Sequence, residues 1–202
     1  MNCTARSKLL VATALCAATF ATAAAQDASS PPQEKPIDPQ TTTRLTLGST
    51  SGTPGTSTVV PVYFTPAGNA AAGRLRFEVT FVSRNLKFTK LDAGIAAELG
   101  NIELQTDLRE SKNEEGLETS TLAVVATAPA SEPKGIPAGL LGYLTFQILE
   151  SARPAVISLR ASAEAAQSGS GTPLADVRAF GAQVEVMAPG EQPAVACFFF
   201  SH

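Results

Sequence analysis

The segment "GRLRFEVTFVSRNLKF", residues 73–88, alternates apolar and polar residues with a period of two. The apolar positions are Leu75, Phe77, Val79 and Phe81. The polar positions beside them are Arg74, Arg76, Glu78 and Thr80. Successive side chains of a β-strand point to opposite faces, so this stretch predicts a strand with one buried face and one solvent-facing face.

Short apolar runs separated by turn signals continue along the chain. We predict further strands over residues 43–49, 57–65, 85–94, 101–109, 117–128, 140–150, 155–165 and 176–187, and a short helical turn over 95–99. Turns such as "SGTPG" (51–55) and "PASEPKGIPAG" (129–139) separate them. Pro61 indicates an edge position or the non-donating side of a strand. Nine short strands without a long helical period predict an all-β sandwich or barrel.

Residues 1–25 have the pattern of a secretory signal peptide. Arg6 and Lys8 precede the apolar run "LLVATALCAATF", and "ATAAA" ends in small residues, which favours cleavage between Ala25 and Gln26. The alternative is an uncleaved anchor, but the segment is short for a membrane span and no charged stop follows it.

A lipoprotein signal would use Cys16, but Leu15 stands where that signal requires a small side chain. No other stretch is long and apolar enough to cross a bilayer. We therefore expect a secreted, periplasmic or cell-surface protein.

Three further regions follow the signal. Residues 26–42 contain four prolines and predict an extended linker. Residues 43–187 hold the predicted strands and are long enough for one packed core. The tail, residues 188–202, contains Cys197 and the apolar run Phe198–Phe200, which could pack on the domain, dock a partner or remain disordered.

Charge and cysteine usage exclude several classes. The formal net charge is −3, and removing Arg6 and Lys8 with the signal would make it −5. No basic run points to a nucleic-acid partner. Only Cys197 would remain after cleavage, so neither an internal disulfide nor a thiolate metal cluster can form.

Catalytic patterns are missing from the sequence. The one histidine is His202, and no nucleophile elbow, zinc-protease motif or nucleotide-binding glycine loop is present. Paired carboxylates could serve a glycosidase, and the candidates are Glu103, Asp107, Glu114, Glu115 and Glu118. They lie in or beside a charged turn, so solvated surface is the simpler interpretation, and we expect neither catalytic residues nor a cofactor.

The sequence also gives little evidence for a metal site or a sugar-binding site. Asp107, Glu110 and Asn113 could form a loose calcium site, but the segment does not fit an EF-hand loop, and we expect no metal. Sugar binding normally uses exposed planar rings. The chain has no Trp, and Tyr63 and Tyr143 lie inside apolar strand runs, so we expect both in the core or between the sheets.

Four segments in register resemble the cohesin domain family. They are "TPGTSTVVPV" (53–62), "RLRFEVTFVSRNLKF" (74–88), "AGLLGYLTFQI" (138–148) and "ISLRASAEAAQSGSGTPLADVRAFGAQVEV" (157–186). The family usually has Tyr-Asp-Pro where this chain has Phe81-Val82-Ser83. The resemblance implies a nine-stranded antiparallel β-sandwich with jelly-roll topology.

The resemblance also implies a function: recognition of a dockerin-like protein module, in which the partner holds the calcium. The contact face would be built from the third, fifth, sixth and eighth predicted strands. Its implied residues are Arg74, Arg76, Glu78, Thr80, Glu103, Gln105, Asp107, Ser158, Arg160 and Ser162. The segment "TSTLAVVAT" does not alternate cleanly, so the sixth strand remains unassigned. Such a module would act in extracellular polysaccharide degradation. The alternatives are a direct carbohydrate-binding module for a polysaccharide and a structural spacer of an envelope protein.

Overall fold

The computed structural model describes residues 37–68, 71–112, 116–130, 134–188 and 190. The predicted signal peptide, most of the predicted linker, Cys197 and Phe198–Phe200 lie outside the described residues. Residues 37–42 are described, and they end in a turn in which the amide of Thr42 donates to the carbonyl of Asp38 at 2.8 Å. No helix among the described residues is long and apolar enough to cross a membrane.

One layer is a five-stranded sheet with the strand order β10-β1-β3-β8-β5. Its strands are β1 (Thr43–Leu47), β3 (Ser57–Thr65), β5 (Leu86–Ala93), β8 (Gly139–Ile148) and β10 (Val177–Phe180).

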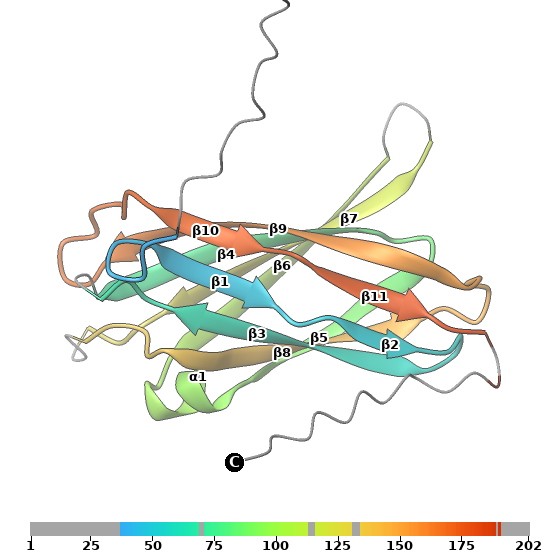
Figure 1. Ribbon diagram of the computed structural model, residues 1–202, viewed down its shortest axis with the longest axis horizontal. Helices are drawn as coiled ribbons and strands as arrows, with labels where there is room; N and C mark the ends of the chain where they lie inside the picture. The colour runs from blue at the N-terminus through green and yellow to red at the C-terminus, as the bar shows by residue number, and fades with distance from the viewer. Residues whose placement is uncertain (1–36, 69–70, 113–115, 131–133, 189, 191–202) are drawn as a thin grey trace, which may run out of the picture. The chain divides into compact units, whose positions relative to one another are not determined.

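The second layer is a six-stranded sheet with the order β2-β11-β9-β4-β7-β6. Its strands are β2 (Thr50–Gly52), β4 (Ala72–Val82), β6 (Glu103–Lys112), β7 (Glu118–Thr127), β9 (Ala155–Gln167) and β11 (Ala182–Val186). The short helix α1 (Ile95–Leu99) connects β5 to β6. The predicted all-β sandwich is therefore confirmed (Figure 1).

Two details differ from the nine antiparallel strands that were predicted. The predicted strand over 176–187 is divided into β10 and β11, and β2 lies in a segment where we expected a turn. In addition, β1 pairs with β10 and β2 pairs with β11 in parallel, so both sheets are mixed.

The division at Gly181 has a steric cause. A Cβ atom at this position would lie 2.2 Å from the carbonyl oxygen of Leu159, so the chain can pass so close to β9 only with glycine. On either side of it, β10 belongs to one sheet and β11 to the other. The pair β1 and β2 crosses between the sheets in the same way, and the two crossing segments lie side by side (Figure 1).

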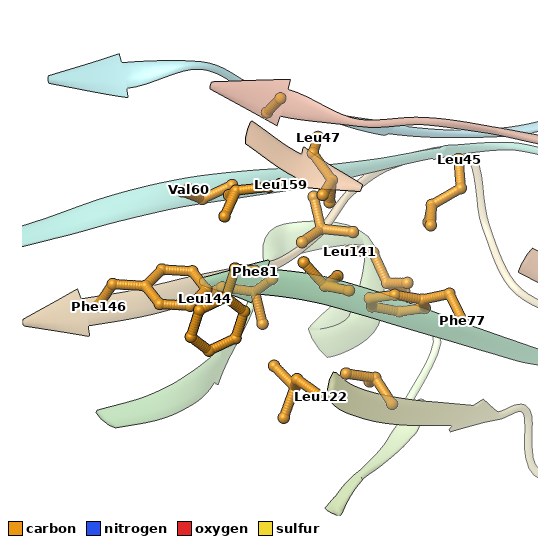
Figure 2. Packing of buried hydrophobic residues seen from close by; sticks show 14 of the residues in the cluster. Leu45, Leu47, Val60, Phe77, Phe81, Leu122, Leu141, Leu144, Phe146 and Leu159 are labelled. Atoms are coloured by element: carbon orange, nitrogen blue, oxygen red, sulfur yellow. The ribbon is translucent and has the colours of Figure 1, made fainter. Parts of the chain in front are cut away.

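The core lies between the inner faces of the two sheets. Leu75, Phe77, Val79 and Phe81 of β4 are at most 2% exposed, which confirms the buried face predicted for this strand. The ring of Phe146 on β8 meets Phe81 edge to face at a centroid distance of 5.1 Å (Figure 2). It also meets the ring of Phe88 on β5 at a centroid distance of 5.9 Å. This cluster joins the two sheets through aromatic contacts.

Pro61 lies in the interior of the five-stranded sheet, because β3 is flanked by β1 and β8. Its carbonyl accepts a hydrogen bond from the amide of Gly48 at 2.8 Å, just past the end of β1. N–H and C=O of one residue in an antiparallel strand point to the same side. The missing donor therefore faces the place where β1 leaves the sheet, so the edge alternative was wrong and the non-donating side applies.

The prediction that Tyr63 and Tyr143 are buried was wrong. Their side chains are 44% and 37% exposed, on the outer face of the five-stranded sheet. The alternation of β3 explains this result, because Val60, Val62 and Phe64 fill the core and the residues between them must point outward. A run such as "VVPVYF" therefore conceals which residues are buried.

We expect Phe77→Ala to lower the free energy of unfolding by about 3–5 kcal/mol, because it leaves a cavity between the sheets. Phe180→Ala is the matched control, since Phe180 is 37% exposed and should lose only about 1 kcal/mol. Urea denaturation of both variants measures the difference. Equal losses would contradict the assignment of the core.

We expect Gly181→Ala to cost about 1–3 kcal/mol of stability, because the added methyl group would meet the rigid backbone of β9. Gly68→Ala serves as the control, since the methyl group there would meet only the mobile amide of Gln40. Thermal unfolding compares the two variants, and an unchanged melting temperature for Gly181→Ala would contradict the close crossing.

Candidate functional site: the outer face of the six-stranded sheet

Four strands of the six-stranded sheet are direct neighbours in the order β9-β4-β7-β6. They correspond to the eighth, third, sixth and fifth strands of the sequence prediction. Their outer surface is called the six-strand face below. Strands far apart in the sequence thus form one continuous surface, and the buried residues of β4 hold it against the core.

All ten residues that the resemblance implied lie on strands of this face, with side chains that are exposed or half-buried. They are Arg74, Arg76, Glu78 and Thr80 on β4; Glu103, Gln105 and Asp107 on β6; and Ser158, Arg160 and Ser162 on β9. Their neighbours along β4 and β9, such as Leu75 and Leu159, are buried. The structure therefore brings the ten residues onto one side of the sheet.

The strand register places these residues in rows across the face. Glu78 lies opposite Ser162 of β9 on one side and Ala123 of β7 on the other, and Ala123 lies opposite Asp107 of β6. Paired residues on neighbouring strands lie about 4.5–5.5 Å apart. A partner that covers one row would therefore contact all four strands.

The sequence left the contribution of β7 unassigned. Its outward residues are Thr119, Thr121, Ala123, Val125 and Thr127, the partners of the outward residues of β4. The alternation is obscured because apolar residues face outward and Ser120 faces the core at 2% exposure. Thr119, Thr121 and Thr127 share one parity, and this was the signal that could have found the face. Arg109 of β6 and Glu164 of β9 were also missed, although both lie on exposed strand positions.

Two shallow hollows lie between β4 and β9. One has a volume of about 300 Å³ and is lined by Arg76, Phe77, Glu78, Ser162, Ala163 and Glu164. The other has about 260 Å³ and is lined by Arg74, Arg76, Glu164, Ala165, Ala166 and Pro173. They arise because the small side chains of Ser162 and Ala166 stand opposite longer side chains of β4. Arg76 and Glu164 belong to both hollows.

Some charges on this face are already paired. Arg76 contacts Glu78, and Arg109 contacts Asp107, both at 2.9 Å. Exposed pairs of this kind contribute little to stability, so a partner can exchange them at small cost. Arg74, Arg160 and Glu164 form no ion pair within the described part of the chain.

A separate groove of about 410 Å³ lies between β5 and the β6–β7 pair, with Leu86, Phe88 and Leu149 among its lining residues. At this groove Lys112 and Glu118 form an ion pair of 2.6 Å. The hydrogen bond between them lowers the pKa of Glu118 and raises the pKa of Lys112. The pair is therefore broken as the pH falls through the lowered pKa of Glu118.

The carboxylates considered for catalysis or metal binding are divided between the two sides of the sheet. Glu103 and Asp107 point outward from β6, whereas Glu110 and Glu118 have the opposite parity and line the groove beside β5. Glu114, Glu115 and Asn113 lie outside the described residues. Where the structure describes the chain, no group of three or more His, Cys, Asp or Glu side chains could hold a metal ion.

The chain is similar to known proteins in its structure. No protein-family model matches the chain, and no curated protein matches it by sequence. The third cohesin of ScaC from Acetivibrio cellulolyticus, solved in complex with the ScaB dockerin, aligns over 72% of this chain and 99% of that chain, with a TM-score of 0.55 and 21% identity.

Two further cohesins give similar values. The OlpA cohesin from Clostridium thermocellum, solved in complex with a dockerin, has a TM-score of 0.56 at 15% identity, over 72% of this chain and 99% of that chain. The seventh type I cohesin of ScaB from Pseudobacteroides cellulosolvens has a TM-score of 0.55 at 16% identity, over 78% and 99%. The two sheets described above, aligned over almost the whole length of these modules, show that the chain has the fold of a cohesin domain.

Proposed function

We propose that the chain is a non-catalytic, exported module that binds a dockerin-like protein through the six-strand face and acts in extracellular polysaccharide degradation. The observation that carries the proposal is the gathering of all ten implied residues on one side of four adjacent strands. Similar folds solved with dockerin partners support the class of partner. The pattern of residues 1–25 supports export.

The centre of the face favours a protein partner of matching shape. Ala123 is 7% exposed, and Val125 and Thr121 beside it on β7 are half-buried, so a flat strip runs between charged residues of β4 and β6. Protein interfaces commonly have an apolar centre with a polar rim. Arg74, Arg160 and Glu164, which form no ion pair with any described residue, can fix the register of a partner by charge.

The partner can be sought by capture from the producing organism. The immobilised protein is exposed to secreted proteins in calcium buffer, and a chelator then elutes what was bound. If the partner resembles a dockerin, the eluted protein contains an oxygen-rich calcium loop that mass spectrometry can identify. The spacer alternative predicts that the chelator releases nothing.

We expect the double variant Arg74→Glu/Arg76→Glu to raise the dissociation constant for the purified, chelator-eluted partner by about tenfold or more, because it reverses two charges on the face. Titration calorimetry measures the affinity. Lys134→Glu/Arg153→Glu is the matched control, since both residues are exposed cations outside the strands.

Thermal unfolding establishes that both variants remain folded. An Arg74→Glu/Arg76→Glu affinity equal to that of the unmodified protein would remove the six-strand face as the binding surface.

A further inference from the structure

The outer face of the five-stranded sheet, called the five-strand face below, presents aromatic rings to solvent on the side opposite the six-strand face. Tyr63 on β3 is 44% exposed, and Tyr143 on β8 and Phe180 on β10 are each 37% exposed. Both tyrosines of the chain are on this face. These rings are exposed to solvent because the inward-facing residues of the same strands already fill the core.

The strand register puts the three rings along a line across the sheet. Phe180 and Tyr63 lie on either side of Thr46, which is paired with both, so they are two strands and about 10 Å apart. Tyr143 is paired with Pro61, two residues from Tyr63, which makes the tyrosines diagonal neighbours about 7–8 Å apart. The exposed Thr46 stands between two of the rings. Rings spaced in this way do not form one compact apolar patch. Their spacing suits an extended ligand with repeated units.

The charge of the five-strand face has the opposite sign to that of the chain. Its five strands contain four basic residues, Arg44, Lys87, Lys90 and Arg178, and one acidic residue, Asp92. Asp92 is paired with Lys90 at 2.9 Å, and Arg178 contacts Asp176, just before β10, at 3.4 Å. The net charge of the whole chain is −3. A basic surface on an acidic protein attracts an anionic ligand.

We propose that the five-strand face binds an anionic polysaccharide, with sugar rings stacked on Tyr63, Tyr143 and Phe180 and uronate carboxylates paired with Arg44, Arg178 and the two lysines. The apolar C–H face of a sugar ring can lie flat on an aromatic ring, and the tyrosine hydroxyl reaches its polar edge. Arginine suits the carboxylates because its planar guanidinium donates two parallel hydrogen bonds.

This inference does not depend on the proposed function. The two faces are on opposite sides of the sandwich, so one molecule can hold a protein partner and a glycan at once. A change on one face leaves the other intact, and failure of either proposal leaves the other standing.

Titration calorimetry of the full chain with hexagalacturonate tests the proposal, and neutral cellohexaose is the comparison ligand. We expect hexagalacturonate to bind and cellohexaose to bind at least about tenfold more weakly. Tyr63→Ala/Tyr143→Ala should weaken hexagalacturonate binding by about tenfold or more, because it removes two stacking surfaces. Lys87→Gln/Lys90→Gln should weaken binding and reduce its dependence on salt.

Lys134→Gln/Arg153→Gln is the matched control and should bind as the unmodified protein does. Phe180→Ser provides a second ring variant, and circular dichroism on heating shows which variants remain folded. Unchanged affinity in the folded ring variants would overturn the proposal, as would equal binding of both sugars. Sedimentation velocity showing self-association that Tyr63→Ala/Tyr143→Ala dissolves, together with no sugar binding, would assign the rings to a second copy instead and would also overturn it.

Discussion

The fold depends on burial of alternate residues between two sheets that face each other. Every second side chain of β4 is buried, and its Phe81 meets Phe146 of the opposite sheet edge to face at 5.1 Å. Because the strand period is two, burial of Leu75, Phe77, Val79 and Phe81 forces the residues between them outward. The core thereby positions the polar face on which the proposed function rests.

The same constraint acts on both layers, with different outcomes. On the six-stranded sheet the outward positions are mostly polar and carry both signs of charge, with small side chains along β7. On the five-stranded sheet they include three exposed rings and a basic excess. The cohesin fold therefore gives this chain two chemically distinct surfaces. We propose a dockerin-like protein as the partner of the first and an anionic glycan as the ligand of the second.

The sequence predicts a strand well where its two faces differ in polarity. The strand over residues 57–65 was found to the residue, and the alternation from Leu75 to Phe81 lies within β4, so the outward residues of β4 follow directly. Prediction failed where both faces carry apolar residues, because Val125 of β7 and Tyr63 of β3 then resemble core residues. It also failed at Gly181, where the break between two sheets depends on the approach of β9, which no local pattern encodes.

The most direct test of the account is a map of the surface that the chelator-sensitive partner covers. Isotope-labelled protein is titrated with the unlabelled partner, and nuclear magnetic resonance records which side chains and amides shift. The account predicts shifts concentrated at Arg74, Ala123 and Ser162 on the six-strand face, with Tyr143 unaffected. Shifts concentrated on the five-strand face, with β4, β7 and β9 unchanged, would contradict it.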